Sequence, residues 1–130
     1  MRKRNLIIFF VLLVAFLVSL PLSAQEFPLN YTDELGREIT IEKEVERIIT
    51  LAPGMTEVIY ALGLEDKLVA VSSACDYPKE ALKKEDVGRI DEPNIEKIVS
   101  LEPDLVIAES VTKIESLERL TELGIKNIGF

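Results

Sequence analysis

The sequence has 130 residues, with 15 Lys and Arg against 23 Asp and Glu, no histidine, and a net charge of −8 at pH 7. Such an acidic chain repels nucleic acid and anionic lipid, so we expect neither as a partner. The single cysteine, Cys75, excludes an internal disulfide. We interpret Cys75 as a small buried packing residue, because without histidine it has no general base to make it a nucleophile.

Residues 1–24 have the pattern of an export signal peptide. A basic start at residues 2–4 precedes an apolar run over residues 6–20, and Ala24 is a small residue suited to cleavage before Gln25. Cleavage would place residues 25–130 in the periplasm or another extracytoplasmic space. That segment carries 12 basic and 23 acidic residues, because only Arg2, Lys3 and Arg4 are lost. The alternative is an uncleaved membrane anchor, although the apolar run is shorter than the ~20 residues that a spanning helix needs.

A short β-hairpin opens the folded segment. Residues 31–33 and 37–41 read as its strands, and Ile39 and Ile41 alternate with polar neighbours. Gly36 suits the turn between them because the turn needs a positive φ. We therefore predict a small two-stranded unit ahead of the main fold.

Strands and helices then alternate. Short apolar runs at 48–51, 68–71, 105–108 and 125–130 predict buried strands, and apolar residues at helical spacing predict helices over 55–62, 95–99 and 114–123. Asn94 is a good N-cap for the middle helix. This alternation predicts an α/β fold with a Rossmann-like parallel sheet. Because the sequence stops inside an apolar strand, we expect an uncovered sheet edge at residues 125–130 and interpret the lobe as truncated.

An ordered series of motifs carries a family resemblance over residues 30–130. Its members are Thr32-Asp33 with Leu35-Gly36-Arg37, Arg47 to Pro53, Ala61 to Leu64, Cys75 to Pro78, Pro93 to Ile98, and Leu101 to Ile107. The sequence resembles the periplasmic substrate-binding proteins of ABC importers for iron-siderophores, heme and cobalamin. The resemblance implies two α/β lobes with the ligand between them, and residues 25–130 correspond to the N-terminal lobe.

The first candidate contact is the loop after residues 48–51, with Pro53, Gly54, Met55 and Thr56. In open α/β sheets ligands lie beyond the carboxyl ends of the strands, where free helix-start amides attract anionic groups. The alternative is an ordinary turn. The resemblance implies that this loop lies on the floor of the ligand cleft.

Two further loops complete the candidate site. The resemblance implies ligand contacts at Ser73, Ala74, Arg89 and Ile90, although cobalamin-binding relatives carry aromatic residues where Ala74 and Ile90 stand. On these grounds we rank cobalamin below anionic chelates. Arg89 suits anionic oxygens but is equally explained as a solvated charge. We interpret Tyr77 as a buried structural residue.

Glu96 is the candidate contact for a protein partner. The resemblance implies that it docks on ABC permease subunits in the inner membrane. The alternative is that it only complements the positive end of its helix. The expected partners are thus the permease and a small metal chelate or corrinoid, with no cofactor beyond chelated iron or cobalt in the ligand.

Two other classes of protein remain as alternatives. An enzyme lacks support because the sequence has neither histidine nor a Gly-x-Ser-x-Gly elbow. Without histidine, we also expect no direct site for a bare metal ion. A truncated or membrane-anchored lobe without binding activity is the second alternative.

Overall fold

The computed structural model describes residues 1–18 and 26–130. The first helix, α1 (Arg2–Val18), is exposed over residues 2–10. In the described ranges, no helix is both long and apolar enough to cross a membrane. The predicted cleavage site between Ala24 and Gln25 lies outside the described residues, so the signal peptide stays a prediction.

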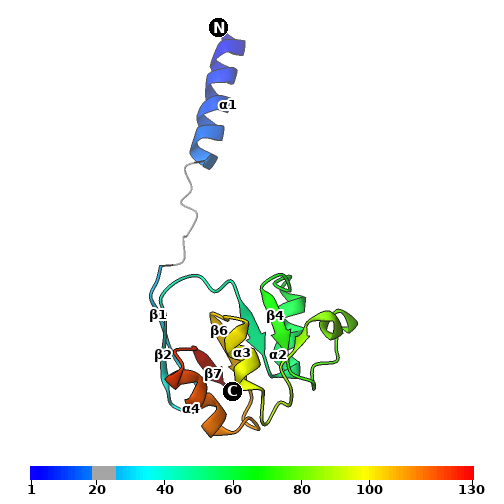
Figure 1. The fold of residues 1–130 in the computed structure, drawn as a ribbon. Coiled ribbons are helices and arrows are strands. Elements are labelled where there is room, and N and C mark those ends of the chain that lie inside the picture. The colour runs from blue at the N-terminus through cyan, green and yellow to red at the C-terminus, as the bar shows by residue number, and fades with distance from the viewer. Residues whose placement is uncertain (19–25) are drawn as a thin grey trace.

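A parallel sheet of five strands forms the centre of the fold (Figure 1), in the order β5-β4-β3-β6-β7. Its strands are β3 (Ile48–Thr50), β4 (Leu68–Val71), β5 (Glu85–Asp86), β6 (Leu105–Ala108) and β7 (Asn127–Gly129). This arrangement confirms the predicted α/β parallel-sheet fold. The sequence did not predict β5, because its two residues are exposed acids with no apolar pattern.

Helices cover the sheet unequally. The helices α3 (Ile95–Ser100) and α4 (Ile114–Glu122) pack on one face, and α2 (Pro53–Ala61) packs on the other. A short 3-10 helix, η1 (Lys79–Lys83), leads into β5. The predicted cap is confirmed, because the Asn94 side chain accepts a hydrogen bond of 2.9 Å from the amide of Lys97.

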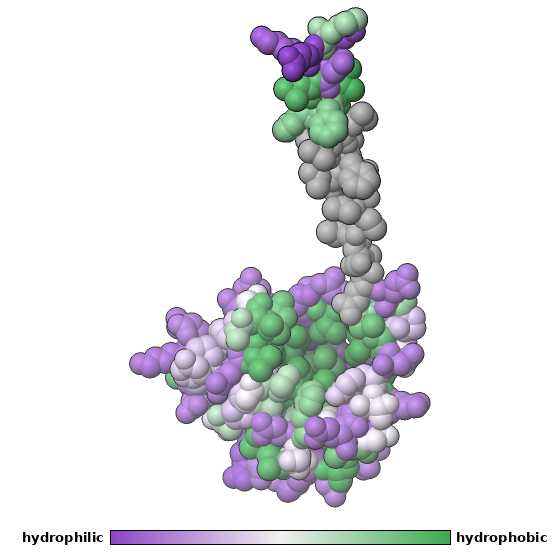
Figure 2. Space-filling view, turned by 180° about the vertical axis from the view of Figure 1, so that it is seen from behind, coloured by the Kyte–Doolittle hydropathy of each residue, from purple (hydrophilic) through white to green (hydrophobic). Residues whose placement is uncertain are grey.

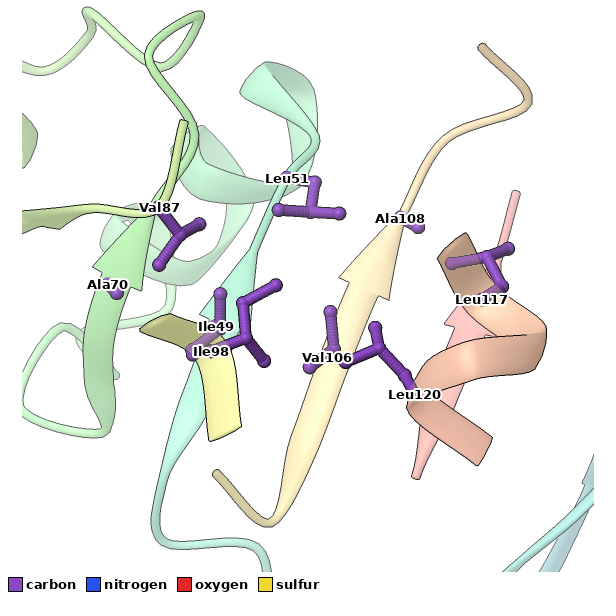
Figure 3. Close-up of a cluster of buried hydrophobic side chains, with 9 residues drawn as sticks. All are labelled: Ile49, Leu51, Ala70, Val87, Ile98, Val106, Ala108, Leu117 and Leu120. Atoms are coloured by element: carbon purple, nitrogen blue, oxygen red, sulfur yellow. The ribbon is translucent and has the colours of Figure 1, made fainter. Parts of the chain in front are cut away.

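The larger core lies between the sheet and the α3–α4 layer (Figure 3). Nine residues form it, all at most 1% exposed: Ile49, Leu51, Ala70, Val87, Ile98, Val106, Ala108, Leu117 and Leu120. Each fully buried Leu, Ile or Val contributes about 1.5–3 kcal/mol. This layer therefore holds β3, β4 and β6 against the two helices and fixes the positions of the loops at the ends of these strands.

The opposite face of the sheet is only partly covered. Ile59 of α2 packs with Ile48, Leu68, Val71, Cys75 and Ile107, but Leu105, Ile128 and Phe130 remain half-buried. Apolar residues gather on this side of the molecule, as Figure 2 shows from behind. Parallel sheets normally have both faces covered. The part of this face over β6 and β7 is therefore an apolar surface in the described structure.

The predicted hairpin is confirmed. Its strands are β1 (Leu29–Thr32) and β2 (Glu38–Ile41), paired antiparallel with Tyr31 opposite Ile39. Gly36 has the expected positive φ, 75°. The Asp33 carboxylate is buried in the turn and accepts hydrogen bonds from the amide of Arg37 and from its guanidinium, at 2.7–2.9 Å.

This turn also caps the outer edge of β7. The Gly129 amide donates to Asp33 at 3.2 Å, the Gly129 carbonyl accepts from the Glu34 amide at 3.3 Å, and Arg37 donates to the Asn127 side chain at 2.8 Å. The expectation of an uncovered edge at residues 125–130 is therefore wrong. The apolar pattern of that strand could not reveal a cap supplied by residues more than 90 positions earlier.

Candidate functional site

The loops at the carboxyl ends of the strands form one connected rim. Ser72 Oγ donates to the Leu51 carbonyl at 2.7 Å, which joins the loops after β3 and β4. The Ser73 amide donates to the Gly88 carbonyl at 2.8 Å and so joins the loops after β4 and β5. Thr112 Oγ1 donates to the Ile90 carbonyl at 2.9 Å and adds the loop after β6. These bonds hold the rim in a set shape before any ligand arrives.

The first loop presents some of its predicted residues and buries one. Gly54 is exposed, and Pro53 and Met55 are half-buried. Thr56 is fully buried, and both its amide and its hydroxyl donate to the Ala52 carbonyl, at 3.0 and 3.1 Å. Neither group of Thr56 is free to meet a ligand in this structure. Thr56 supports the loop, and the contacting atoms available are those of Pro53, Gly54 and Met55.

Cys75 lies beneath the rim. Its side chain is 2% exposed, and its sulfur lies 3.2 Å from Thr56 Oγ1 and 3.4 Å from Ser72 Oγ. Cys75 is therefore a buried packing residue, which confirms the prediction made from the sequence. The hydroxyls of Thr56 and Ser72 lie on either side of this thiol, and no sequence pattern connects the three residues.

Ser73 and Ala74 are exposed on the second loop. Tyr77, a few residues further along, is 64% exposed, so its interpretation as a buried structural residue is wrong. Tyr77 lines a hollow of about 450 Å³ together with Val58 and Tyr60, which both belong to α2. The apolar ring therefore lies beside α2 and not in the core.

Arg89 is exposed on the third loop but already has a partner. Its guanidinium makes two hydrogen bonds with the Asp91 carboxylate, at 2.8 and 2.7 Å. Hydrogen bonding and charge raise the pKa of Arg89 and lower the pKa of Asp91. The neighbouring Ile90 is half-buried and packs against the larger core. Asp91 was not predicted as a site residue, although its place two residues after Arg89 is a signal for such a pair.

The rim as a whole carries more acid than base. Its bases are Arg89 and Lys113, and each is paired, the second with Glu92 at 2.9 Å. Asp76 and Glu109 add two more carboxylates on neighbouring loops. An anionic ligand would meet no concentrated positive charge here. In the described ranges there is also no group of three or more His, Cys, Asp or Glu side chains placed to hold a metal ion.

Glu96 is exposed in the first turn of α3, next to the rim loop that ends at Asn94. The neighbouring Lys97 instead pairs with Glu85 at 3.0 Å. Among the described residues, no basic group lies within ion-pair distance of Glu96. Its carboxylate is therefore available to a partner.

Loops at the carboxyl ends of parallel strands are the place where open α/β sheets bind ligands. Residues 48–129 match the family model described as periplasmic binding protein. This match covers more than half of the 130 residues, and the chain belongs to the periplasmic binding protein family.

Curated relatives are named as binding proteins, one of them for an ABC transporter. The chain is 42% identical over 97 residues to YvrC of Bacillus subtilis, named as an ABC transporter substrate-binding lipoprotein, and covers 31% of it. It is 52% identical over 80 residues to a vitamin B12-binding protein of Vibrio cholerae. The matched stretch is 61% of this chain and 29% of the relative. The chain thus spans about a third of the length of these relatives.

Solved structures agree with this assignment. The vitamin B12-binding protein BtuF of Vibrio cholerae shares 49% identity and a TM-score of 0.60 over 65% of this chain and 34% of its own. The heme-binding protein HmuT shares 27% identity and a TM-score of 0.70 over 85% of this chain and 38% of its own. These similar proteins are named as binding proteins, not as enzymes.

Proposed function

We propose that this chain is a lobe of the substrate-binding component of an ABC importer, and that its ligand is a corrinoid such as cobalamin. The observation that carries this proposal is the connected rim of loops at the strand ends, in a chain similar to vitamin B12-binding proteins. The contacts would come from Pro53, Gly54, Met55, Ser73, Ala74, Arg89 and Ile90, with Thr56 positioning the first loop.

Two observations support ranking cobalamin above the anionic chelates, the opposite of the order expected from the sequence. The rim is acidic and Arg89 is neutralised by Asp91, which disfavours the carboxylates of heme and of anionic siderophores. The amide side chains of a corrinoid carry no such charge. The identity to vitamin B12-binding proteins, 49–52%, also exceeds the 27% identity to HmuT. Heme remains the second candidate because HmuT covers 85% of the chain.

Ala74 and Ile90 still distinguish this rim from one that stacks aromatic rings on the ligand. With one rim contacting one side of a bulky ligand, we expect binding in the micromolar range or weaker, because tight small-molecule sites bury most of the ligand surface. Iron or cobalt would enter with the ligand, not as a cofactor of the protein.

The protein would act outside the cytoplasm. Residues 1–24 would serve as a signal peptide cleaved after Ala24, and residues 25–130 would form the lobe. Glu96, exposed and beside the rim, would dock on the ABC permease, where charge fixes the register between the partners.

The test is a titration of the purified chain with cyanocobalamin and with hemin, followed by ligand absorbance and by calorimetry. We expect saturable cobalamin binding that is tighter than heme binding. Ala74→Trp should tighten cobalamin binding by about twofold to tenfold, because an aromatic contact adds about 0.5–1.5 kcal/mol. The matched control is Leu82→Trp, on the exposed surface of η1.

Absence of binding to either ligand would contradict the proposed function. Tighter binding of heme than of cobalamin would overturn the ligand assignment. Sub-micromolar cobalamin binding by this chain alone would show that the rim does not need a second lobe.

A further inference from the structure

The hollow beside α2 contains two aromatic rings and lies apart from the rim. It encloses about 450 Å³, a size that suits a small molecule. None of the proposed rim contacts lines it. Its lining residues come from α2 and from the loop after β4: Glu57, Val58, Tyr60, Ala61, Tyr77 and Pro78.

The two rings are held differently. Tyr60 is half-buried and packs against the smaller core, which includes Ile59, so its ring is fixed in place. Tyr77 is exposed and belongs to the loop after β4. Glu57 lies on the same face of α2 as Tyr60 and Ala61, because residues three and four positions apart are neighbours on a helix. The hollow thus combines two aromatic rings, apolar side chains and a carboxylate.

Unpaired carboxylates lie in and near this hollow. Neither Glu57 nor Glu80 forms an ion pair with another described residue. Burial and the charges of Glu80 and Glu65 raise the pKa of Tyr60, so these two carboxylates lie close to its ring. In the described ranges, Glu65 Oε2 is buried without a hydrogen-bond partner. The ammonium of Lys84 donates to the backbone carbonyl of Glu65 at 2.7 Å but does not line the hollow.

We propose that this hollow binds a small organic cation whose nitrogen is alkylated, such as a quaternary ammonium compound. The faces of aromatic rings are negative and attract a cation, and the carboxylates add to this attraction. An alkylated nitrogen carries its charge on an apolar surface, which matches the side chains of Val58, Ala61 and Pro78. The inference does not depend on the proposed function, because the rim takes no part in this site.

The lining selects this class of ligand over others. An anion would be repelled by the carboxylates. A bare metal ion would find no group of three or more ligating side chains in the described ranges. A primary ammonium or a guanidinium needs several acceptors when it leaves water, whereas Glu57 is the only charged acceptor among the described lining residues. An alkylated cation needs few hydrogen bonds and gains from both the rings and the charge.

The test is a titration of the intact chain with choline, followed by nuclear magnetic resonance of isotope-labelled tyrosine rings. The sequence has three tyrosines, and Tyr31, on the hairpin, lies outside the hollow and serves as an internal reference. We expect choline to shift the signals of Tyr60 and Tyr77 saturably and to leave Tyr31 unchanged. Dimethylbutanol, the neutral carbon analogue of choline, should bind about fivefold more weakly because it lacks the charge.

Variants test the rings and the charge separately. Tyr77→Leu should weaken choline binding by about twofold to fivefold, and Tyr77→Phe should retain it, because phenylalanine keeps the ring. Glu57→Gln should also weaken binding, whereas Glu118→Gln, at an exposed acid of α4, should not. Circular dichroism melts establish that each variant is folded.

Three outcomes would overturn the inference. Equal affinity for choline and dimethylbutanol would show that charge plays no part in binding. Absence of saturable shifts at Tyr60 and Tyr77 would show that the hollow binds no such cation. Equal shifts at Tyr31 would show that choline contacts exposed rings without a specific site.

Discussion

The carboxylate of Asp33 accepts a hydrogen bond of 3.2 Å from the backbone amide of Gly129, 96 residues further along the chain. The same carboxylate binds the guanidinium of Arg37, which in turn donates to Asn127. One buried acid therefore joins the hairpin to the outer edge of β7. This bond protects an edge that would otherwise be free to pair with another chain.

Asp33→Ala should destabilise the fold by about 3 kcal/mol, because it leaves Arg37 and the Gly129 amide without their acceptor. The measurement is the free energy of unfolding in urea. Asp66→Ala, at an exposed acid, should change stability by less than about 0.5 kcal/mol. Equal effects of the two substitutions would show that the Asp33 bonds contribute little.

The stabilisation by Asp33 should depend on pH. Burial of Asp33 disfavours its charged form, but hydrogen bonds from Arg37 and Gly129 outweigh burial and hold the pKa of its carboxyl below the ordinary value. A lowered pKa in the folded state gives stability that is complete above the unfolded value of about 3.9 and is lost as pH falls through the folded value. The difference in unfolding free energy between the protein and Asp33→Asn should therefore be constant near neutral pH and shrink below about pH 4. A difference that grows on acidification would contradict this assignment.

Gly129 leaves room for Leu35 of the hairpin turn. A Cβ at position 129 would lie 2.9 Å from Leu35 Cδ1, which is too close unless that side chain moves. We expect Gly129→Ala to cost about 1 kcal/mol, as modest overpacking does, and expect Leu35→Ala to remove most of that cost. The measurement is a double-mutant cycle on unfolding free energies. Additive effects would mean that the two residues do not compete for space.

Asp91 should control the preference of the rim for ligand charge. Asp91→Asn frees Arg89 from its ion pair, so heme should bind about threefold to tenfold more tightly while cobalamin changes little. Titration of both ligands measures the ratio, and Arg89→Gln in the same background should abolish the gain. Glu57→Gln, outside the rim, serves as the control. If Asp91→Asn changes the affinity for both ligands equally, Arg89 does not determine the preference of the rim for ligand charge.

The half-covered sheet face should bind apolar dyes. Ile128 and Phe130 are half-buried on the side of the sheet that α2 leaves open over β7. We expect fluorescence of an anilinonaphthalene dye with the native chain, and expect Phe130→Asp to lower it. Val111→Asp, at an exposed residue of the β6 rim loop, should not. The same dye signal in all three proteins would place the dye elsewhere.

The main strands and helices follow from local patterns, which is why the sequence predicts them well. Ile49 and Val106 sit in apolar runs, and Asn94 caps the helix that follows it. Long-range relationships have no such pattern. No residue near Gly129 indicates that its amide donates to Asp33. The two exposed acids of β5 form a strand only because they pair with β4.

The candidate site was predictable in position but not in detail. Strand ends indicated which loops meet, since all parallel strands finish at one edge. The burial of Thr56 and the exposure of Tyr77 depend on how α2 packs on the sheet, which the residue types do not reveal. Similarly, Arg89 read alone suggested a positive contact, and its pairing with Asp91 changes the charge that a ligand meets.

Cys75 lies 2% exposed between Ser72 and Thr56, at the junction of the loops that form the rim, and it is the single thiol of the sequence. A thiol reagent can reach it only when these loops part. The rate at which the intact protein is labelled therefore reports opening of this region without an engineered cysteine. A ligand seated on the rim would slow that labelling, and the protein thus carries its own chemical reporter of occupancy.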